Sequence, residues 1–242
     1  MHTLFGTKHI ILMIVSFIAI ILGCFGSRKL TLKQNIKILF FVGIVSEIIK
    51  VFYYIVNNEA THNGYLPKTD LPFHLCSIQI IFIAILYLSK NENLKRKLKA
   101  FMMPSCLFGG IFAILIATDS SRNGMWLISL QYFGYHVAIT IFALYLLTSK
   151  EIKWDIKDYF NCLILLAVFG FGSIYLNSIL NDGSSPINFM YTVAPPQEGL
   201  PYLNKDKGWL VYITRYAFLA FVLISLVYIK PIINEIKMKI KK

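Results

Sequence analysis

Seven apolar segments of membrane-spanning length follow one another along the chain, and this repetition limits the fold more than any other feature. A helix needs about 20 predominantly apolar residues to cross the hydrocarbon core of a bilayer. The segments cover residues 10–25, 36–56, 73–88, 100–117, 125–147, 160–180 and 209–229. They predict an all-α, polytopic integral membrane protein with seven transmembrane helices in one domain over residues 1–242. The third segment is the shortest, and it needs Leu71 and Pro72 near the interface to reach across.

The positive charge indicates how these spans are oriented. The chain has a net charge of +12, and most of its 24 Lys and Arg residues fall in alternate connections and in the carboxyl-terminal tail. Cytoplasmic connections are enriched in Lys and Arg, so the amino terminus is expected outside and the carboxyl terminus in the cytoplasm. This orientation predicts a multi-pass protein of a cell membrane. The excess charge then faces anionic lipid and is not a sign of nucleic-acid binding.

One short motif, Leu71-Pro72-Phe73-His74-Leu75-Cys76, places a histidine and a cysteine where the third segment begins. Polar and reactive groups are costly at membrane depth, so such a motif is a candidate functional site. The alternative is structural, with a buried cysteine and a histidine in the headgroup region. The four cysteines of the chain include no CxxC pair and no zinc-type spacing, so they indicate no disulfide framework.

Further polar side chains in or beside the spans predict a pocket. When each span is followed in its expected direction, they lie between mid-bilayer and the outer face, and the inner half has no comparable set. Such groups must face protein or a water-filled cavity, so a polar pocket that opens outward is expected. They are Glu47, Lys50, His74, Cys76, Asp119, Gln131, His136 and Arg215. Two alternatives stay open: Glu47 and Lys50 form a structural pair, or His136 is a satisfied core histidine.

A cysteine in such a pocket becomes a nucleophile when a base or cation favours its thiolate. We prefer His136 as the base and His74 as a positioning residue. If residues 71–76 are extended, His74 can touch Cys76; if the helix has already begun, His74 points away from it. A metal site formed by His74, Cys76, His136 and an acid is the rival, but the chain lacks an HExxH-type pair. No metal and no cofactor are therefore expected.

Residues 181–208 form the longest predicted extracytoplasmic loop, which contains Asn188 and Tyr191 among several prolines. A loop this long beside short ones is typical of a functional segment, and the alternative is a surface cap. Arg215 lies near the start of the last span, next to this loop. We expect an acid, Asp119 or Glu47, within its reach, because an unpaired guanidinium at this depth is costly.

These landmarks resemble a known family. The motif at 71–76 is similar to the signature of the YwaF-like bacterial integral membrane proteins, which are relatives of the eukaryotic transmembrane protein 164. Other matching positions are Glu47, residues 117–119, residues 131–136, residues 188–191 and Gly208-Trp209. Thr118 stands where the family usually has proline, Phe189 where it tends to have tyrosine, and the motif that opens the last span is reduced to Gly208-Trp209.

The resemblance implies a seven-helix fold and, through the eukaryotic branch, acyl transfer between phospholipids by a cysteine. Carried over to this chain, it suggests Cys76 as nucleophile and His136 as base, with a phospholipid or lysophospholipid as partner. The substrate-binding residues expected around them are Glu47, Asp119, Gln131, Asn188, Tyr191 and Arg215. A lipid-ester hydrolase is a close variant of this function. The alternatives are a transporter or flippase for a small anion or lipid headgroup and a non-catalytic membrane partner subunit.

Overall fold

The computed structural model describes residues 5–56, 66–118, 121–122, 124–150, 152–181, 183, 187–197, 200 and 202–240. Within these residues the chain is all-α, as predicted. Its elements are α1 (Thr7–Ser27), α2 (Leu32–Val56), the short 3-10 helix η1 (Lys68–Asp70), α4 (Ile78–Leu88), α5 (Glu92–Leu115), α7 (Trp126–Thr148), α8 (Ile156–Leu180), the 3-10 helix η2 (Phe189–Tyr191), α9 (Trp209–Val227) and α10 (Ile229–Ile240).

Six of the described helices are long and apolar enough to cross a membrane, namely α1, α2, α5, α7, α8 and α9. The third predicted span differs, because α4 begins at Ile78 and has only 11 residues. Residues 71–77 before it form turns. Pro72 contributes to this difference, since it has no N–H to donate and its ring restricts the preceding residue to extended conformations. The fourth predicted span differs at its start, since α5 begins at Glu92 with Asn91 as its N-cap.

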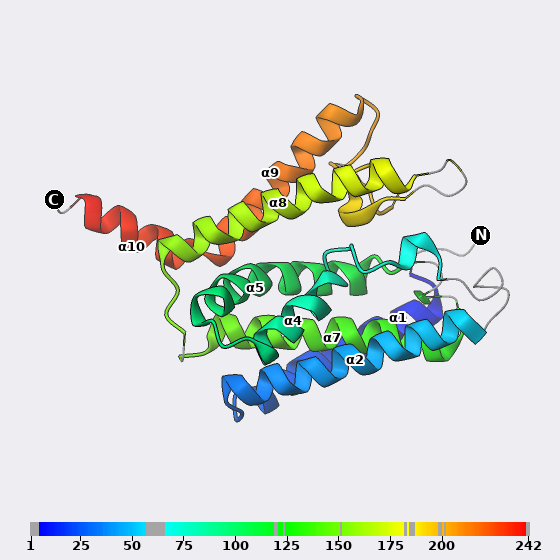
Figure 1. The fold of residues 1–242 in the computed structure, drawn as a ribbon, viewed down its shortest axis with the longest axis horizontal. Helices are drawn as coiled ribbons and strands as arrows, with labels where there is room; N and C mark the ends of the chain where they lie inside the picture. Colours follow the sequence, from blue (N-terminus) through cyan, green and yellow to red (C-terminus); the bar gives the residue numbers. More distant parts are fainter. Residues whose placement is uncertain are drawn as a thin grey trace.

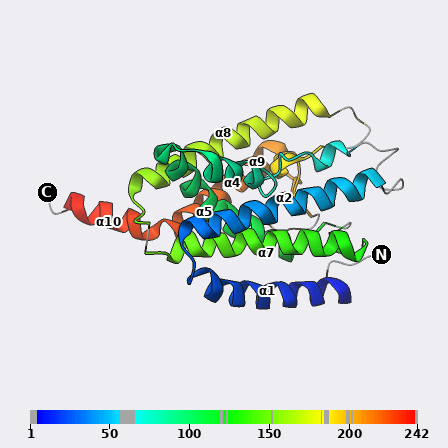
Figure 2. The same ribbon diagram turned by 60° about the horizontal axis from the view of Figure 1, so that its bottom comes forward.

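From α1 to α9, successive α-helices run in alternating directions, so the connections collect at two ends of the molecule, and α10 continues outward from the end of α9 (Figures 1 and 2). We call one end the loop end, where α2 and α8 finish and α7 and α9 begin. The other is the basic end, which holds the α1–α2, α4–α5 and α7–α8 connections and α10. In Figure 1, α8 and α9 lie along one side of the molecule and α1, α2, α4, α5 and α7 form the other.

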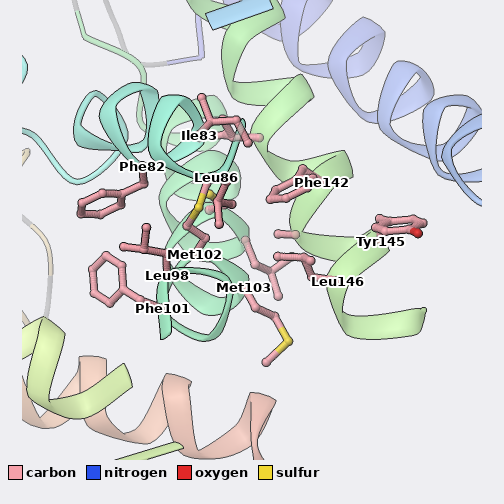
Figure 3. Packing of buried hydrophobic residues seen from close by; sticks show 14 of the residues in the cluster. Phe82, Ile83, Leu86, Leu98, Phe101, Met102, Met103, Phe142, Tyr145 and Leu146 are labelled. Atoms are coloured by element: carbon pink, nitrogen blue, oxygen red, sulfur yellow. The ribbon is translucent and has the colours of Figure 1, made fainter. Parts of the chain in front are cut away.

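The core lies between α4, α5 and α7, where side chains from the three helices point toward one another (Figure 3). Phe101 and Met102 of α5 are fully buried, and Leu146 of α7 lies in the same cluster. Gly110 permits the close approach of α5 to α7, because a Cβ at this position would meet the Thr140 side chain and the His136 carbonyl. This packing holds α7 at a defined height against α5, and α7 carries several of the candidate site residues.

The basic end is closed by a paired polar cluster. The Arg96 guanidinium donates to both carboxylate oxygens of Asp158, at 2.8 and 2.7 Å. Asp155 and Asp158 also form a capping box at the start of α8. Asp158 is only 1% exposed, so its charge is held by the bidentate Arg96 fork and by the helix start. The cluster joins the start of α5 to the start of α8.

Candidate functional site

A cavity of about 710 Å³ lies between the two sides of the molecule. Its walls come from α2, α4, α5, α7, α8, α9 and the segments that precede α4 and α9. The volume falls in the range of pockets that hold small ligands. Eight of the polar residues singled out from the sequence line this one cavity: Glu47, Lys50, His74, Cys76, Gln131, His136, Asn188 and Tyr191.

A charged group stands in the cavity wall near the loop end. The Lys50 ammonium lies 2.8 Å from the Glu47 carboxylate and donates to the carbonyl of Asp70 at 3.1 Å. Burial raises the pKa of the Asp70 carboxyl, and the positive charge of Lys50 opposes this effect. The predicted Glu47–Lys50 pair is thus present, and it also attaches η1 to α2. The bond from Lys50 to the Asp70 carbonyl holds the start of the 71–77 turns in place.

Cys76 sits in the last of these turns. Tyr135 of α7 donates a hydrogen bond to the Cys76 carbonyl at 2.9 Å, so the backbone beside the thiol is fixed to the helix that carries His136. The thiol itself lies 4.0 Å from the Ser77 hydroxyl. Among the described residues, no hydrogen bond joins the thiol to a histidine. Irregular backbone at membrane depth is tolerated where it lines a cavity, and residues 71–77 are consistent with that rule.

His74 points away from Cys76. The Ile78 N–H bonds to the His74 carbonyl at 3.0 Å, so helix-like bonding has begun here, and the two side chains diverge as expected for that geometry. The His74 ring instead packs against the rings of Phe189 and Tyr191, with centroids 5.3 and 5.6 Å away. It therefore connects the 71–77 turns to η2, which fits a positioning role.

His136 has one nitrogen held and one free. Its Nδ1 lies 2.7 Å from the Tyr132 carbonyl, which can only accept, so Nδ1 carries a proton. The Tyr132 ring lies 4.2 Å from the imidazole and restricts its rotation. The ring is 3% exposed, and its Nε2 has no hydrogen-bond partner among the described residues. In the neutral ring this second nitrogen is therefore an unoccupied acceptor, which is what a general base requires.

The two predicted amide donors differ in their availability. The Gln131 amide nitrogen donates to the Ser46 hydroxyl at 2.6 Å, across to α2. Asn188 serves its own loop, because its carbonyl oxygen accepts from the backbone of Val193 and Ala194. Its nitrogen donates to the Ala194 carbonyl at 2.9 Å. Asn188 thus shapes the segment of residues 187–197, which we call the cap segment.

Three side chains hold the cap segment against the cavity, and one of them, Asn177, was not singled out from the sequence. Asn177 of α8 accepts from the Phe189 N–H at 2.8 Å and donates to the Phe189 carbonyl at 3.1 Å. Trp209 donates to the Thr192 carbonyl at 2.8 Å, and the Tyr212 hydroxyl donates to the Tyr191 carbonyl. A polar asparagine within a predicted span must face protein or water, so Asn177 could have been singled out from the sequence as a contact residue.

The backbone of the cap segment is unusual where it meets the cavity. Met190 and Tyr191 both have a backbone φ of 53°, in the left-handed region that residues other than glycine rarely adopt. Such conformations persist where the surrounding structure determines them, and they concentrate at binding and active sites. Both residues line the cavity.

One described site residue, Arg215, is not brought into this group. Arg215 is absent from the cavity lining; it donates to Asn204 Oδ1 at 3.2 Å and to the Tyr202 carbonyl at 3.4 Å. Its guanidinium lies 5.8 Å from the Tyr202 ring, and Tyr202 does line the cavity. Glu47, one of the acids expected near Arg215, is paired with Lys50. Asp119, the other, lies outside the described residues.

The cavity thus combines a thiol, an imidazole nitrogen free to accept a proton, and amide and charged groups toward its loop end. Within the part of the chain that the structure describes, no group of three or more His, Cys, Asp or Glu side chains could hold a metal ion.

Comparison with known proteins gives one match. The model of the TMEM164 family matches residues 4–228, which is nearly the whole chain. No curated protein and no solved structure matches.

Proposed function

The chain belongs to the TMEM164 family and is a multi-pass membrane protein, and from that premise we propose that it transfers or hydrolyses phospholipid acyl groups through a thioester on Cys76. The observation that carries the proposal is the free Nε2 of His136, buried in the wall of the cavity that Cys76 also lines. A base with an empty acceptor and a thiol in the same cavity are the two parts that covalent acyl transfer needs.

The first step forms the thioester. His136 Nε2 takes the thiol proton, and the sulfur attacks the ester carbonyl carbon of a phospholipid. A sulfur–carbon bond forms, the ester carbon–oxygen bond breaks, and the leaving lysophospholipid oxygen takes the proton back from His136. The Tyr132 carbonyl holds the opposite nitrogen throughout and favours the imidazolium that forms between the two transfers.

The second step returns the thiol. The hydroxyl of a lysophospholipid, or water in the hydrolase variant, gives its proton to His136 and attacks the thioester carbonyl. The carbon–sulfur bond breaks, and the thiolate recovers the proton from His136. Gln131 lines the same cavity, and the second hydrogen of its amide nitrogen, which is not the one given to Ser46, is the donor for the carbonyl oxygen; Asn188 holds the cap segment beside it. Arg215 beside Tyr202 adds positive charge for the lipid phosphate, and Glu47 and Tyr191 complete the proposed headgroup site.

We also propose seven passes with the amino terminus outside, in the bacterial plasma membrane. Six passes are the six long helices. The remaining pass, third in chain order, consists of α4 with the 71–77 turns before it, which together bridge the distance that an 11-residue helix cannot. The orientation is supported by the basic residues, which gather at the basic end, opposite the cap segment. The cavity then opens toward the outer leaflet.

The test is acyl transfer by the reconstituted protein. Vesicles receive a phospholipid donor and a lysophospholipid acceptor, and products are measured by mass spectrometry. We expect Cys76→Ala to abolish turnover and to leave the helix content unchanged, because a small residue replaces a small one. Cys106→Ala is the matched control, since this thiol is fully buried in the core and does not line the cavity. Equal turnover by the Cys76→Ala protein would exclude the covalent mechanism.

A further inference from the structure

The cavity changes character along its length. Toward the loop end its wall carries the Glu47–Lys50 pair, Asp70 and His74. On α9 the lining residues are Tyr216, Leu219, Ala220, Leu223 and Ile224. Their spacing places them on one face of the helix, which extends the cavity by ~12 Å from Tyr216 to Ile224 at 1.5 Å per residue. The helix therefore forms a continuous, mostly apolar wall leading away from the charged end.

The far part of the cavity, which we call the deep limb, is lined by apolar side chains from three helices. They are Phe101 of α5, Cys162 and Leu166 of α8, and Leu223 and Ile224 of α9. Phe101 and Cys162 are fully buried, and Ile224 is 6% exposed. None of these five side chains carries a charge, so the deep limb suits a hydrocarbon and offers nothing to a polar headgroup.

A pair of tyrosines stands behind the deep limb. Tyr159 and Tyr228 are buried, with ring centroids 5.7 Å apart, and neither belongs to the cavity lining. The Tyr228 hydroxyl donates to the Ala100 carbonyl at 2.8 Å, and the Tyr159 hydroxyl lies 3.0 Å from that of Ser225. These bonds tie α5, α8 and α9 together at this level. Phe101, Cys162 and Ile224 belong to the same packed cluster as the two tyrosines, so the limb has a firm floor.

We infer that the deep limb receives the acyl chain of the lipid, methyl end toward Ile224, and that Ile224 sets the longest chain that fits. The inference rests on the proposed function for the identity of the ligand. Each methylene buried in an apolar site strengthens binding. Once the chain meets a packed floor, a further methylene forces side chains out of place and weakens binding. Affinity should therefore pass through a maximum as the chain is lengthened.

The experiment measures binding in the absence of turnover. The Cys76→Ala protein is reconstituted in vesicles with an equimolar mixture of lysophospholipids that differ only in the length of one saturated chain. The protein is then re-isolated in detergent, and the retained homologues are quantified by mass spectrometry. Because no thiol chemistry is needed, the measurement can succeed or fail independently of the proposed catalytic mechanism.

Three variants in this background test the role of Ile224. Ile224→Ala should deepen the limb and shift the preferred homologue to a longer chain. The ratio of longer to shorter retained homologues should rise roughly tenfold, the lower limit for one methylene in a hydrophobic pocket. Ile224→Val removes a single methylene, so it should fold and shift the preference less in the same direction. Leu226→Ala is the control, because this α9 residue is 59% exposed and outside the lining.

A shift in both Ile224 variants with none in Leu226→Ala supports the assignment. Retention that does not depend on chain length overturns it. An unchanged preference in Ile224→Val and Ile224→Ala, with lysophospholipid still retained, overturns it as well. In either of these cases acyl transfer through Cys76 is judged separately, by the turnover assay.

Discussion

Two regions of the molecule, the basic end and the cavity, use polar side chains in opposite ways. At the basic end, the Arg96 guanidinium and the Asp158 carboxylate meet in a bidentate pair, and Asp158 also takes part in the capping box of α8. In the cavity, by contrast, the buried His136 ring near the middle of α7 has one nitrogen bonded and the other without a partner among the described residues. A fully paired group is a stabilising element, while a buried group with a free acceptor is destabilising unless a ligand uses it.

This difference separates stability from function. The paired cluster at the basic end joins two helix starts and has no group left over for a substrate. At the loop end, Asn177, Trp209 and Tyr212 hold the cap segment and leave the cavity side chains exposed to a ligand. Substitutions at the basic end should therefore lower the free energy of unfolding, and those around the cavity should lower turnover.

The largest effect is expected from the base. His136→Ala should lower acyl transfer by about 10²–10⁴-fold, the usual contribution of a general base. It should also slow alkylation of Cys76 near neutral pH. His9 is the matched control, because it is a buried histidine with both nitrogens bonded, to the Phe5 N–H at 3.2 Å and the Ile114 carbonyl at 3.0 Å. If His9→Gln slowed alkylation as much as His136→Ala, the contrast between a free and a satisfied histidine would be lost.

A smaller effect on turnover is expected from the anchor of the cap segment. Asn177→Ala leaves the Phe189 N–H without its partner and removes one of the donors to the Phe189 carbonyl, which costs about 1–3 kcal/mol. Since about 1.4 kcal/mol corresponds to a tenfold change, KM should rise roughly tenfold with a smaller change in kcat. Asn181→Ala, at the exposed end of α8, should leave both constants unchanged. An unaltered KM in the Asn177 variant would show that the cap segment takes no part in binding.

At the basic end the expected effect is on stability alone. Arg96→Ala removes both guanidinium donors to the buried Asp158 carboxylate and leaves it the Asp155 N–H, which should lower the free energy of unfolding by about 1–3 kcal/mol. Chemical denaturation in detergent measures this loss. Turnover per folded molecule should not change, because Arg96 lies outside the cavity lining. A large drop in turnover at full folding would remove the distinction between the two regions.

The smallest effect concerns Asp70, whose pKa burial raises above its ordinary value. A carboxyl with a raised pKa in the folded state favours folding below its unfolded pKa, and this contribution is lost as the pH rises through the folded pKa. Asp70→Asn should therefore raise Tm slightly at neutral pH. It should also reduce the gain in Tm that the wild type shows on mild acidification. Thermal unfolding at two pH values tests this; an identical pH dependence in both proteins would contradict it.

Much of this arrangement was accessible from the sequence. The all-α class and six long helices follow from apolar runs of spanning length, which need no knowledge of tertiary contacts. The cavity lining followed in part from one rule, that polar residues in spans face protein or water, which grouped Glu47, Cys76, Gln131 and His136. The family was recognised from the motif at 71–76 and is confirmed over residues 4–228.

Other features depend on contacts that local patterns do not contain. The apolar run at 73–88 gave no sign that α4 begins only at Ile78, because hydrophobicity does not distinguish turns that line a cavity from a helix. The Tyr135 bond to the Cys76 carbonyl joins residues 59 positions apart. Arg215 binds Asn204 and Tyr202, oxygen acceptors in its own preceding loop, and a search for acids would not find them.

The central claim is that Cys76 carries the acyl group. The most direct measurement is to incubate the reconstituted wild-type protein with phospholipid alone, quench with acid, and analyse its peptides by mass spectrometry. We predict an acyl adduct on the peptide that contains Cys76, released by neutral hydroxylamine as a thioester and absent from the Cys76→Ala protein. Acyl transfer that proceeds with no adduct on Cys76, or with the adduct on another residue, would contradict the account.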